Sequence, residues 1–157
     1  MSNRRFLERV LDENIRLATL EDHSIAVFFA DLDDFKKVND MYGHDAGDRA
    51  LVAVAARLLS VFRDGDYVAR VGGDEFVVAA PGVKDVRSIA SMADKVVASF
   101  NEPLAITEGP ISVSISVGVA RFPEHGHNSQ ELIKRADDAM YLIKRTGKGA
   151  WRLWSAF

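Results

Sequence analysis

Two separate clusters of carboxylates in this sequence carry the residue types that bind divalent cations. The apolar run AVFFADLDDF contains Asp31, Asp33 and Asp34 at its carboxyl end, and RVGGDEFVV places Asp74 and Glu75 directly after two glycines. Residues two apart in an extended chain share a face, so Asp31 and Asp33 are expected to point the same way. Carboxylates gathered beside a buried strand repel one another unless a cation neutralises them.

Each cluster taken alone also has a purely structural explanation. Paired glycines allow a tight hairpin turn with solvated acids at its tip, and aspartates often end strands or cap helices. The two clusters together favour a site, because Asp31 would meet Asp74 and Glu75 if the first strand lies beside the hairpin. Oxygen ligands from two segments suit Mg²⁺, which keeps some waters and also binds phosphate oxygens. Paired Mg²⁺ ions support in-line displacement at phosphorus.

Lysines near these acids could add phosphate contacts. Phe35 and Lys36 open a helix directly after the first acidic cluster, where free backbone N–H groups bind anions. Lys144 and Lys148 lie one turn apart at the end of the last predicted helix. The structural alternatives are a solvated lysine for Lys36 and compensation of the helix dipole for the other two.

Hydrophobic periodicity predicts the elements that position these groups. Helical spacing predicts helices at 4–20, 34–41, 48–62, 85–100 and 128–146. Apolar runs predict strands at 24–35, 67–71, 76–80, 104–107, 111–120 and 150–154. We expect Asp45 or Asp48 to cap the third helix, Asn128 to begin the last one in a capping box, and Gly147 to end it.

The order α-β-α-α-β-β-α-β-β-α-β contains two hairpins and therefore predicts an α+β domain with a central, mainly antiparallel sheet covered by helices. In the second hairpin, strict alternation predicts one buried and one polar face for a single strand. The alternating apolar residues are Ile111, Val113, Ile115, Val117 and Val119.

Composition restricts the classes of function. The 157 residues suffice for one domain. The net charge of −3 and the lack of a basic patch argue against a groove that binds nucleic acid. The sequence contains no cysteine, which excludes thiolate metal sites. Because no apolar run approaches the roughly 18 residues of a membrane helix, we expect a cytoplasmic domain without membrane contact, whatever anchor a parent protein carries elsewhere.

Four stretches, in this order along the chain, resemble motifs of the GGDEF domain of diguanylate cyclases. They are DLDDFKKVNDMYGHDAGD, RVGGDEF, SISVGVA and ADDAMYLIKRTGK, which together span most of the chain. The resemblance implies a palm-like fold related to nucleotidyl cyclases and the condensation of two GTP molecules into cyclic di-GMP with release of pyrophosphate. It further implies Mg²⁺ or Mn²⁺ as cofactor and a homodimer in which two half-sites face each other.

The resemblance also assigns roles to residues of this chain. Asp74 is implied to accept the proton of the attacking 3′-hydroxyl, and Lys36 to stabilise charge in the transition state. The implied metal ligands are Asp31, the carbonyl of Leu32, Asp74 and Glu75. The implied GTP-binding residues are Phe35, Lys36, Asn39, His44, Asp48, Gly72, Gly73, Lys144 and Lys148, with Asn39 and Asp48 on the guanine.

A possible regulatory site follows the third helix. The stretch RDGD places Arg63 and Asp66 in the R-x-x-D pattern, with Asp66 six positions before Gly72, and the resemblance implies an inhibitory site for the product there. The alternative is an arginine at a helix end followed by a turn aspartate. The sequence departs from the family at Lys148, which stands where arginine is usual and lacks its bidentate fork.

The opening motif of the family is largely missing, so residues 1–157 are interpreted as a single, N-terminally truncated GGDEF domain from a larger signalling protein. Sensory domains, and a phosphodiesterase domain as a further candidate, are the expected neighbours in the parent chain. Two alternatives to an active cyclase remain open. One is a catalytically weak GTP-binding module that regulates a phosphodiesterase, and the other is a cyclic di-GMP receptor. We expect weak activity from the isolated domain, because nothing in it enforces dimerisation.

Overall fold

The apolar run of the first acidic cluster forms the centre of the sheet. In the computed structural model, which describes residues 4–156, β1 (Ile25–Leu32) pairs antiparallel with β3 (Glu75–Pro81) on one side and with β6 (Ile115–Phe122) on the other. The edge strands are β2 (Tyr67–Arg70), antiparallel to β3, and β7 (Trp151–Leu153), parallel to β6. The sheet order is therefore β2-β3-β1-β6-β7, and the predicted mainly antiparallel sheet is confirmed.

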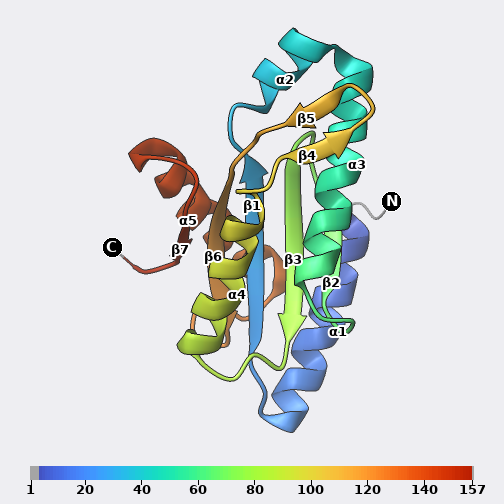
Figure 1. Cartoon of the computed structure of the whole chain (residues 1–157). Coiled ribbons are helices and arrows are strands. Elements are labelled where there is room, and N and C mark those ends of the chain that lie inside the picture. Colours follow the sequence, from blue (N-terminus) through green and yellow to red (C-terminus); the bar gives the residue numbers. More distant parts are fainter. Residues whose placement is uncertain (1–3, 157) are drawn as a thin grey trace.

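Helices cover both faces of this sheet (Figure 1). Helices α3 (His44–Val61) and α4 (Val86–Ser99) lie on one face, and α1 (Arg4–Glu21) and α5 (Ser129–Thr146) lie on the other. The short α2 (Phe35–Tyr42) follows β1 at the end of the sheet where β1 terminates. The α+β prediction is therefore confirmed.

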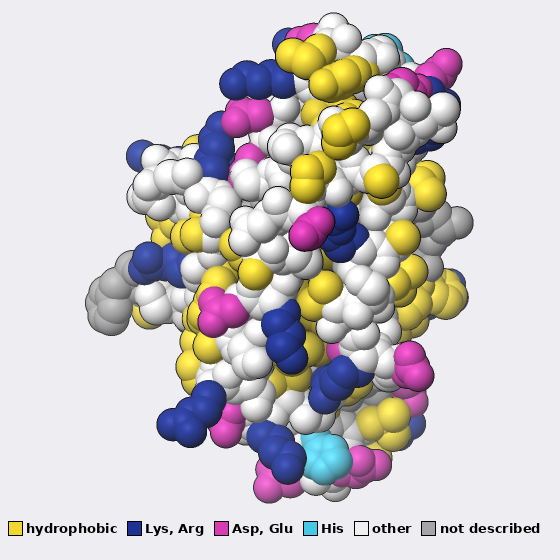
Figure 2. All heavy atoms as spheres, viewed as in Figure 1, with side chains coloured by type: hydrophobic (Ala, Val, Ile, Leu, Met, Phe, Trp, Pro, Cys, Tyr) yellow, Lys and Arg dark blue, Asp and Glu magenta, His cyan; other side chains and the backbone are white. Residues whose placement is uncertain are grey.

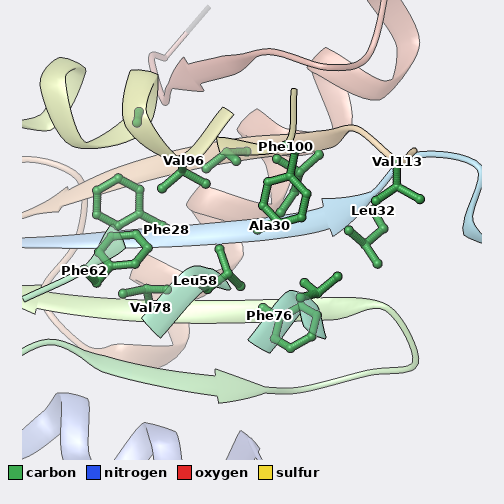
Figure 3. Packing of buried hydrophobic residues seen from close by; sticks show 14 of the residues in the cluster. Phe28, Ala30, Leu32, Leu58, Phe62, Phe76, Val78, Val96, Phe100 and Val113 are labelled. Atoms are coloured by element: carbon green, nitrogen blue, oxygen red, sulfur yellow. The ribbon is translucent and has the colours of Figure 1, made fainter. Parts of the chain in front are cut away.

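Each face of β1 supports its own hydrophobic core, because alternate side chains of a strand point in opposite directions. Phe28, Ala30 and Leu32 point toward α3 and α4, where Figure 3 shows them beside side chains of both helices. The rings of Phe28 and Phe62 meet edge to face with centroids 5.2 Å apart. Val27 and the other inward residues of the opposite face pack against α1 and α5.

The predicted second hairpin is wrong in its details. Residues 111–120 do not form one strand, because β5 (Gly109–Ile111) pairs with β4 (Leu104–Ile106) in a separate two-stranded sheet and β6 begins only at Ile115. Ser114 lies in the break, and its carbonyl accepts a hydrogen bond from the Asp33 N–H at 2.9 Å. The predicted polar face is also wrong, because α5 covers it and Ser116 is fully buried.

The helix boundaries show how local turns override spacing. Helix α3 begins four residues before the predicted start, at His44, and neither Asp45 nor Asp48 caps it. Gly43, with φ of 92°, ends α2 and begins α3, so a glycine turn replaces the expected side-chain cap. At α5 the predicted ends are confirmed, since Asn128 accepts from the Glu131 N–H at 2.8 Å and the helix ends before Gly147. The capping box is only half formed, because the Glu131 carboxylate accepts from the His127 N–H at 3.0 Å instead of from the Asn128 N–H.

Close packing of α5 on β6 depends on Gly118. A Cβ atom at this position would collide with backbone atoms of Ala136 and Met140 on α5. The absence of a side chain therefore lets the helix approach the sheet and fixes the position of the lysines at its carboxyl end.

We predict that Gly118→Ala destabilises the domain by about 1–3 kcal/mol, the usual cost of forcing extra volume into a packed core. Urea unfolding measures the change. Gly65→Ala is the matched control, because a Cβ at Gly65 meets no atom within 4 Å, and its effect should stay within about 0.5 kcal/mol. An equal effect of the two substitutions would contradict the packing argument.

Candidate active site

The two acidic clusters meet at the carboxyl end of β1. Asp31 and Glu75 face each other in the register of β1 and β3, and the Leu32 N–H donates to the Asp74 carbonyl at 3.3 Å. The expectation that the first strand would lie beside the hairpin, and so bring Asp31 to Asp74 and Glu75, is confirmed. Three carboxylates from two segments therefore share one end of the sheet.

The electrostatics of this cluster are unfavourable without a cation. Burial raises the pKa of Asp31 to about 7, Lys144 opposes the shift, and Asp74 and Glu75 reinforce it. Burial also raises the pKa of Glu75, with further contributions from Asp137 and Asp74. The folded protein therefore holds carboxylates that favour a proton or another positive charge.

A divalent cation fits this group of oxygen atoms. The Oδ1 atom of Asp31 is buried and makes no hydrogen bond to any residue between 4 and 156. Such an orphaned acceptor is costly, and hard cations such as Mg²⁺ take carboxylate and carbonyl oxygens while keeping several waters. Within the described residues, no three His, Cys, Asp or Glu side chains converge into a ready-made metal cluster. A metal here would therefore rely on water or ligand oxygens as well.

Asp31 and Asp33 share a neighbour, as expected from their spacing, because Lys144 Nζ lies 3.8 Å from Asp31 Oδ1 and 2.8 Å from Asp33 Oδ1. Strand β1 ends at Leu32, and the Asp33 carboxylate turns toward β6. Its oxygens accept from Ser114 Oγ and Ser116 Oγ, each at 2.6 Å, and from the Gly149 N–H at 2.9 Å. Asp33 is thus a buried, fully hydrogen-bonded anchor.

Most of the predicted nucleotide-binding residues line one cavity of about 300 Å³ beside the acidic cluster. Helix α2 and the start of α3 form one wall, and the tip of the β2–β3 hairpin forms another. The predicted residues in its lining are Phe35, Lys36, Asn39, His44, Asp48, Gly73 and Asp74. The cavity is large enough for part of one nucleotide.

Several residues that shape this cavity were not predicted from the sequence. Arg70 lines it, and its Nε donates to the carbonyls of Gly72 and Gly73 at 3.0 and 2.9 Å, which holds the hairpin tip closed. Gly47 lies in α3 against the Asn39 side chain, and a Cβ there would collide with the Asn39 amide oxygen. A glycine inside a helix was the available signal for this close approach.

The lysines at the end of α5 lie on the other side of the β1 terminus. Lys144 Nζ donates to the Leu32 carbonyl and to Asp33 Oδ1, each at 2.8 Å. Lys148 adopts a positive φ of 63° and donates to Asp34 Oδ1 at 2.8 Å. Neither lysine lines the 300 Å³ cavity, although both contact the segment that connects β1 to α2.

The R-x-x-D residues lie at the opposite end of the sheet, between α3 and β2 (Figure 1). The Arg63 side chain donates to both oxygens of Asp66, and its Nη2 also donates to the Pro81 carbonyl at 2.9 Å. The Asp66 side chain is only 1% exposed, whereas the Arg63 side chain is 53% exposed. The pair therefore closes on itself and ties α3 to the end of β3.

The visible surface carries mixed charges. Figure 2 shows basic, acidic and hydrophobic side chains interspersed over the face formed by α3, α4, β4 and β5, without a continuous basic stripe on that face. Between residues 4 and 156, no helix combines the length and the apolar character needed to cross a membrane.

Comparisons with known proteins match this arrangement. Residues 1–150 fit the family profile described as "Diguanylate cyclase, GGDEF domain". The chain therefore belongs to the GGDEF family, and the resemblance noted in its motifs is confirmed. Over 154 residues it is 39% identical to the diguanylate cyclase TpbB of Pseudomonas aeruginosa, covering 98% of this chain and 35% of that protein. It thus spans about a third of the length of this relative.

Other relatives differ in activity. The cyclic di-GMP phosphodiesterase PdeR of Escherichia coli is 38% identical over 149 residues, which cover 95% of this chain and 22% of that protein.

Among solved structures, the GGDEF domain of TpbB superimposes with a TM-score of 0.96 at 38% identity, covering 100% and 98% of the two chains. The GGDEF domain of DgcB from Caulobacter crescentus in complex with c-di-GMP gives a TM-score of 0.86 at 26% identity, covering 98% and 91%.

We predict that Asp31→Asn stabilises the metal-free domain at alkaline pH. The pKa of Asp31 is about 7 in the folded state, against an ordinary value of 3.8. Between these two pH values the folded domain keeps a proton on Asp31 that the unfolded chain has already released. The free energy of unfolding therefore falls across this window, and the substitution removes that fall. The side chain is 20% exposed, so we expect a gain of only about 1 kcal/mol.

Urea unfolding in the presence of a chelator, at about pH 4.5 and about pH 8, measures this difference. The gain should be seen at the higher pH and shrink at the lower one. A variant that is less stable than the wild type at both pH values would contradict the electrostatic account of Asp31.

Proposed function

We propose that this chain is a diguanylate cyclase domain, which condenses two GTP molecules into cyclic di-GMP and pyrophosphate. The observation that carries the proposal is the cavity between α2, α3 and the hairpin tip, because it opens beside Asp31 and Asp74 at the end of β1. Family membership and the 39% identity to the cyclase TpbB support the same reaction.

The residues divide the work between recognition and chemistry. Asn39 and Asp48 bind the guanine, since an aspartate accepts hydrogen bonds from the two N–H groups on its edge. Phe35 and His44 complete the contacts to GTP, and Gly72 and Gly73 let the backbone approach it. Arg70 keeps the hairpin tip in place through its bonds to these glycine carbonyls.

The groups at the end of β1 stabilise the charge of the phosphates and of the transition state. Asp31, the Leu32 carbonyl, Asp74 and Glu75 would hold Mg²⁺ or Mn²⁺, which supplies neutralisation of the phosphate charge when bound. Lys36, Lys144 and Lys148 bind the phosphates, and Lys36 stabilises the charge that develops in the transition state. Asp74 accepts the proton of the attacking 3′-hydroxyl.

The reaction needs two copies of the domain, because a cavity of about 300 Å³ does not hold two GTP molecules. In the proposed homodimer, two half-sites face each other and each 3′-hydroxyl attacks the α-phosphate of the other nucleotide. Orienting both substrates supplies much of the rate acceleration. We propose that residues 1–157 form one domain of a longer cytoplasmic signalling chain whose other domains, sensory ones among them, bring two copies together.

A second candidate function is a GTP-binding module that regulates a phosphodiesterase. The similarity to PdeR over 95% of this chain favours it, as does Lys148, whose Nζ is paired with Asp34 and lacks the fork of an arginine. The buried, orphaned Asp31 Oδ1 and the intact acidic cluster favour the active cyclase instead.

We predict that the domain, fused to a dimeric coiled coil, forms cyclic di-GMP from GTP and Mg²⁺, and that Asp74→Ala lowers the rate about 10²–10⁴-fold because the proton acceptor is lost. Mass spectrometry of the product measures the activity, and Glu13→Ala, which removes an exposed acid of α1 that pairs with Arg16 at the surface, is the control. Turnover that is undiminished in Asp74→Ala would contradict the mechanism.

GTP titration of the same samples separates the two candidate functions. Tight GTP binding without product, even in the forced dimer, would favour the regulatory module. GTP binding that survives in both Asn39→Ala and Asp48→Ala would contradict the assignment of the guanine site.

We also propose that Arg63 and Asp66 bind the product as an inhibitor, because Arg63 is 53% exposed and keeps donors available beyond its contacts to Asp66. Arg63→Ala should raise the inhibitory concentration of cyclic di-GMP at least about tenfold, the loss expected for a charged hydrogen bond. Initial rates measured at increasing product concentration test this, with the exposed Arg16→Ala as control. Unchanged inhibition in Arg63→Ala would leave the pair with a structural role alone.

A further inference from the structure

Lys144 occupies the position of a cation at the end of β1. Its Nζ lies 2.8 Å from the Leu32 carbonyl oxygen, 2.8 Å from Asp33 Oδ1 and 3.8 Å from Asp31 Oδ1. The side chain is only 19% exposed, so the ammonium group is held among these oxygens with little water around it. The positive charge is thus built into the protein beside this acidic cluster.

Two of these oxygens belong to the proposed metal ligands. The Leu32 carbonyl and the Asp31 carboxylate would bind Mg²⁺ in the proposed function, yet in this structure the ammonium group contacts the first and lies close to the second. Two positive charges at this separation repel each other strongly where the surroundings are partly buried. A free divalent ion and Lys144 in its present position therefore compete for the same oxygens.

The surroundings allow Lys144 to leave. Asp33 is the buried partner that would suffer most from the departure, but it retains the hydroxyls of Ser114 and Ser116 and the N–H of Gly149. A buried carboxylate with three remaining donors stays satisfied. The four-carbon stem of a lysine also lets its ammonium group swing while the helix stays in place.

We infer that Lys144 is an internal counter-cation that blocks the metal site against a free divalent ion and moves to the triphosphate when a nucleotide binds. The inference rests on the proposed function, because it uses the same metal ligands. It adds an order of events, in which the metal enters tightly only together with the phosphate that draws Lys144 away. The nucleotide-free protein is thereby kept from binding a divalent ion tightly without its substrate.

The test is a titration of Mn²⁺, followed by electron paramagnetic resonance, on the wild type and on Lys144→Met without nucleotide. Lys144→Met should bind Mn²⁺ at least about tenfold more tightly, a difference of about 1.4 kcal/mol. With GTP present the advantage should shrink or reverse, because the variant lacks a phosphate ligand. Lys144→Gln, which keeps a donor but not the charge, should behave like Lys144→Met.

Two further variants locate the effect. Lys134→Met removes a lysine of the same helix whose Nζ pairs with Asp138 at the surface, and it should leave Mn²⁺ affinity unchanged. Asp31→Asn in the Lys144→Met background should abolish the gain. A circular dichroism melt of each variant confirms that the titrated protein is folded.

The outcomes distinguish a failure of the Lys144 inference from a failure of the proposed function. Equal or weaker Mn²⁺ affinity in both folded Lys144 variants overturns the inference, even if the wild type binds Mn²⁺ with GTP in an Asp31-dependent way and the proposed function stands. Mn²⁺ binding that ignores Asp31 in every variant, with and without GTP, overturns the proposed metal site as well.

Discussion

The buried carboxylate of Asp33 is the interaction on which the geometry of the site depends. Burial alone would raise its pKa, but hydrogen bonds from Lys144, Ser114 and Ser116 outweigh burial and lower it. A buried charge without hydrogen-bond donors would cost several kcal/mol, so the bonds from Ser114, Ser116 and the Gly149 N–H, which remain when Lys144 moves, are required once the strand ends here. They tie β1, β6 and the end of α5 together at one point.

This anchor allows the neighbouring residues to remain poorly satisfied. Asp31, two positions earlier, has a buried oxygen atom without a hydrogen-bond partner among the described residues and a pKa raised to about 7. Such a group costs stability, and it persists because Asp33 on one side and the Leu32–Asp74 hydrogen bond on the other fix the strand end. The unfavourable electrostatic energy of Asp31 is located where a bound cation and nucleotide would reduce it.

Local sequence patterns predicted the parts of the fold that depend on local physics. Apolar periodicity located the helices and the central strand, and the expected pairing of that strand with the hairpin correctly placed Asp31 beside Asp74 and Glu75. The alternation of apolar residues failed to predict the structure of residues 111–120, because the break at Ser114 is fixed by the hydrogen bond from Asp33, more than 80 positions away in the chain. The prediction failed at α3 for a different reason, since Gly43 supplied the turn that we had assigned to an aspartate cap.

The sequence predicted which residues belong to the candidate site, but not the contacts that hold them in place. Motif resemblance named most of the residues that line the cavity. It gave no indication that Arg70 holds the hairpin tip, that Gly47 makes room for Asn39, or that Lys144 contacts the Leu32 carbonyl. These contacts join segments far apart in the sequence, and no local period carries information about them.

The most direct test of this account is a crystal structure of the domain with Mg²⁺ and a GTP analogue that cannot be cyclised. The account predicts that Lys144 Nζ moves from the Leu32 carbonyl to a phosphate oxygen, that a metal ion contacts Asp31, and that Asp33 keeps its bonds to Ser114, Ser116 and Gly149. Lys144 still bound to the Leu32 carbonyl, with the metal held away from Asp31, would contradict it.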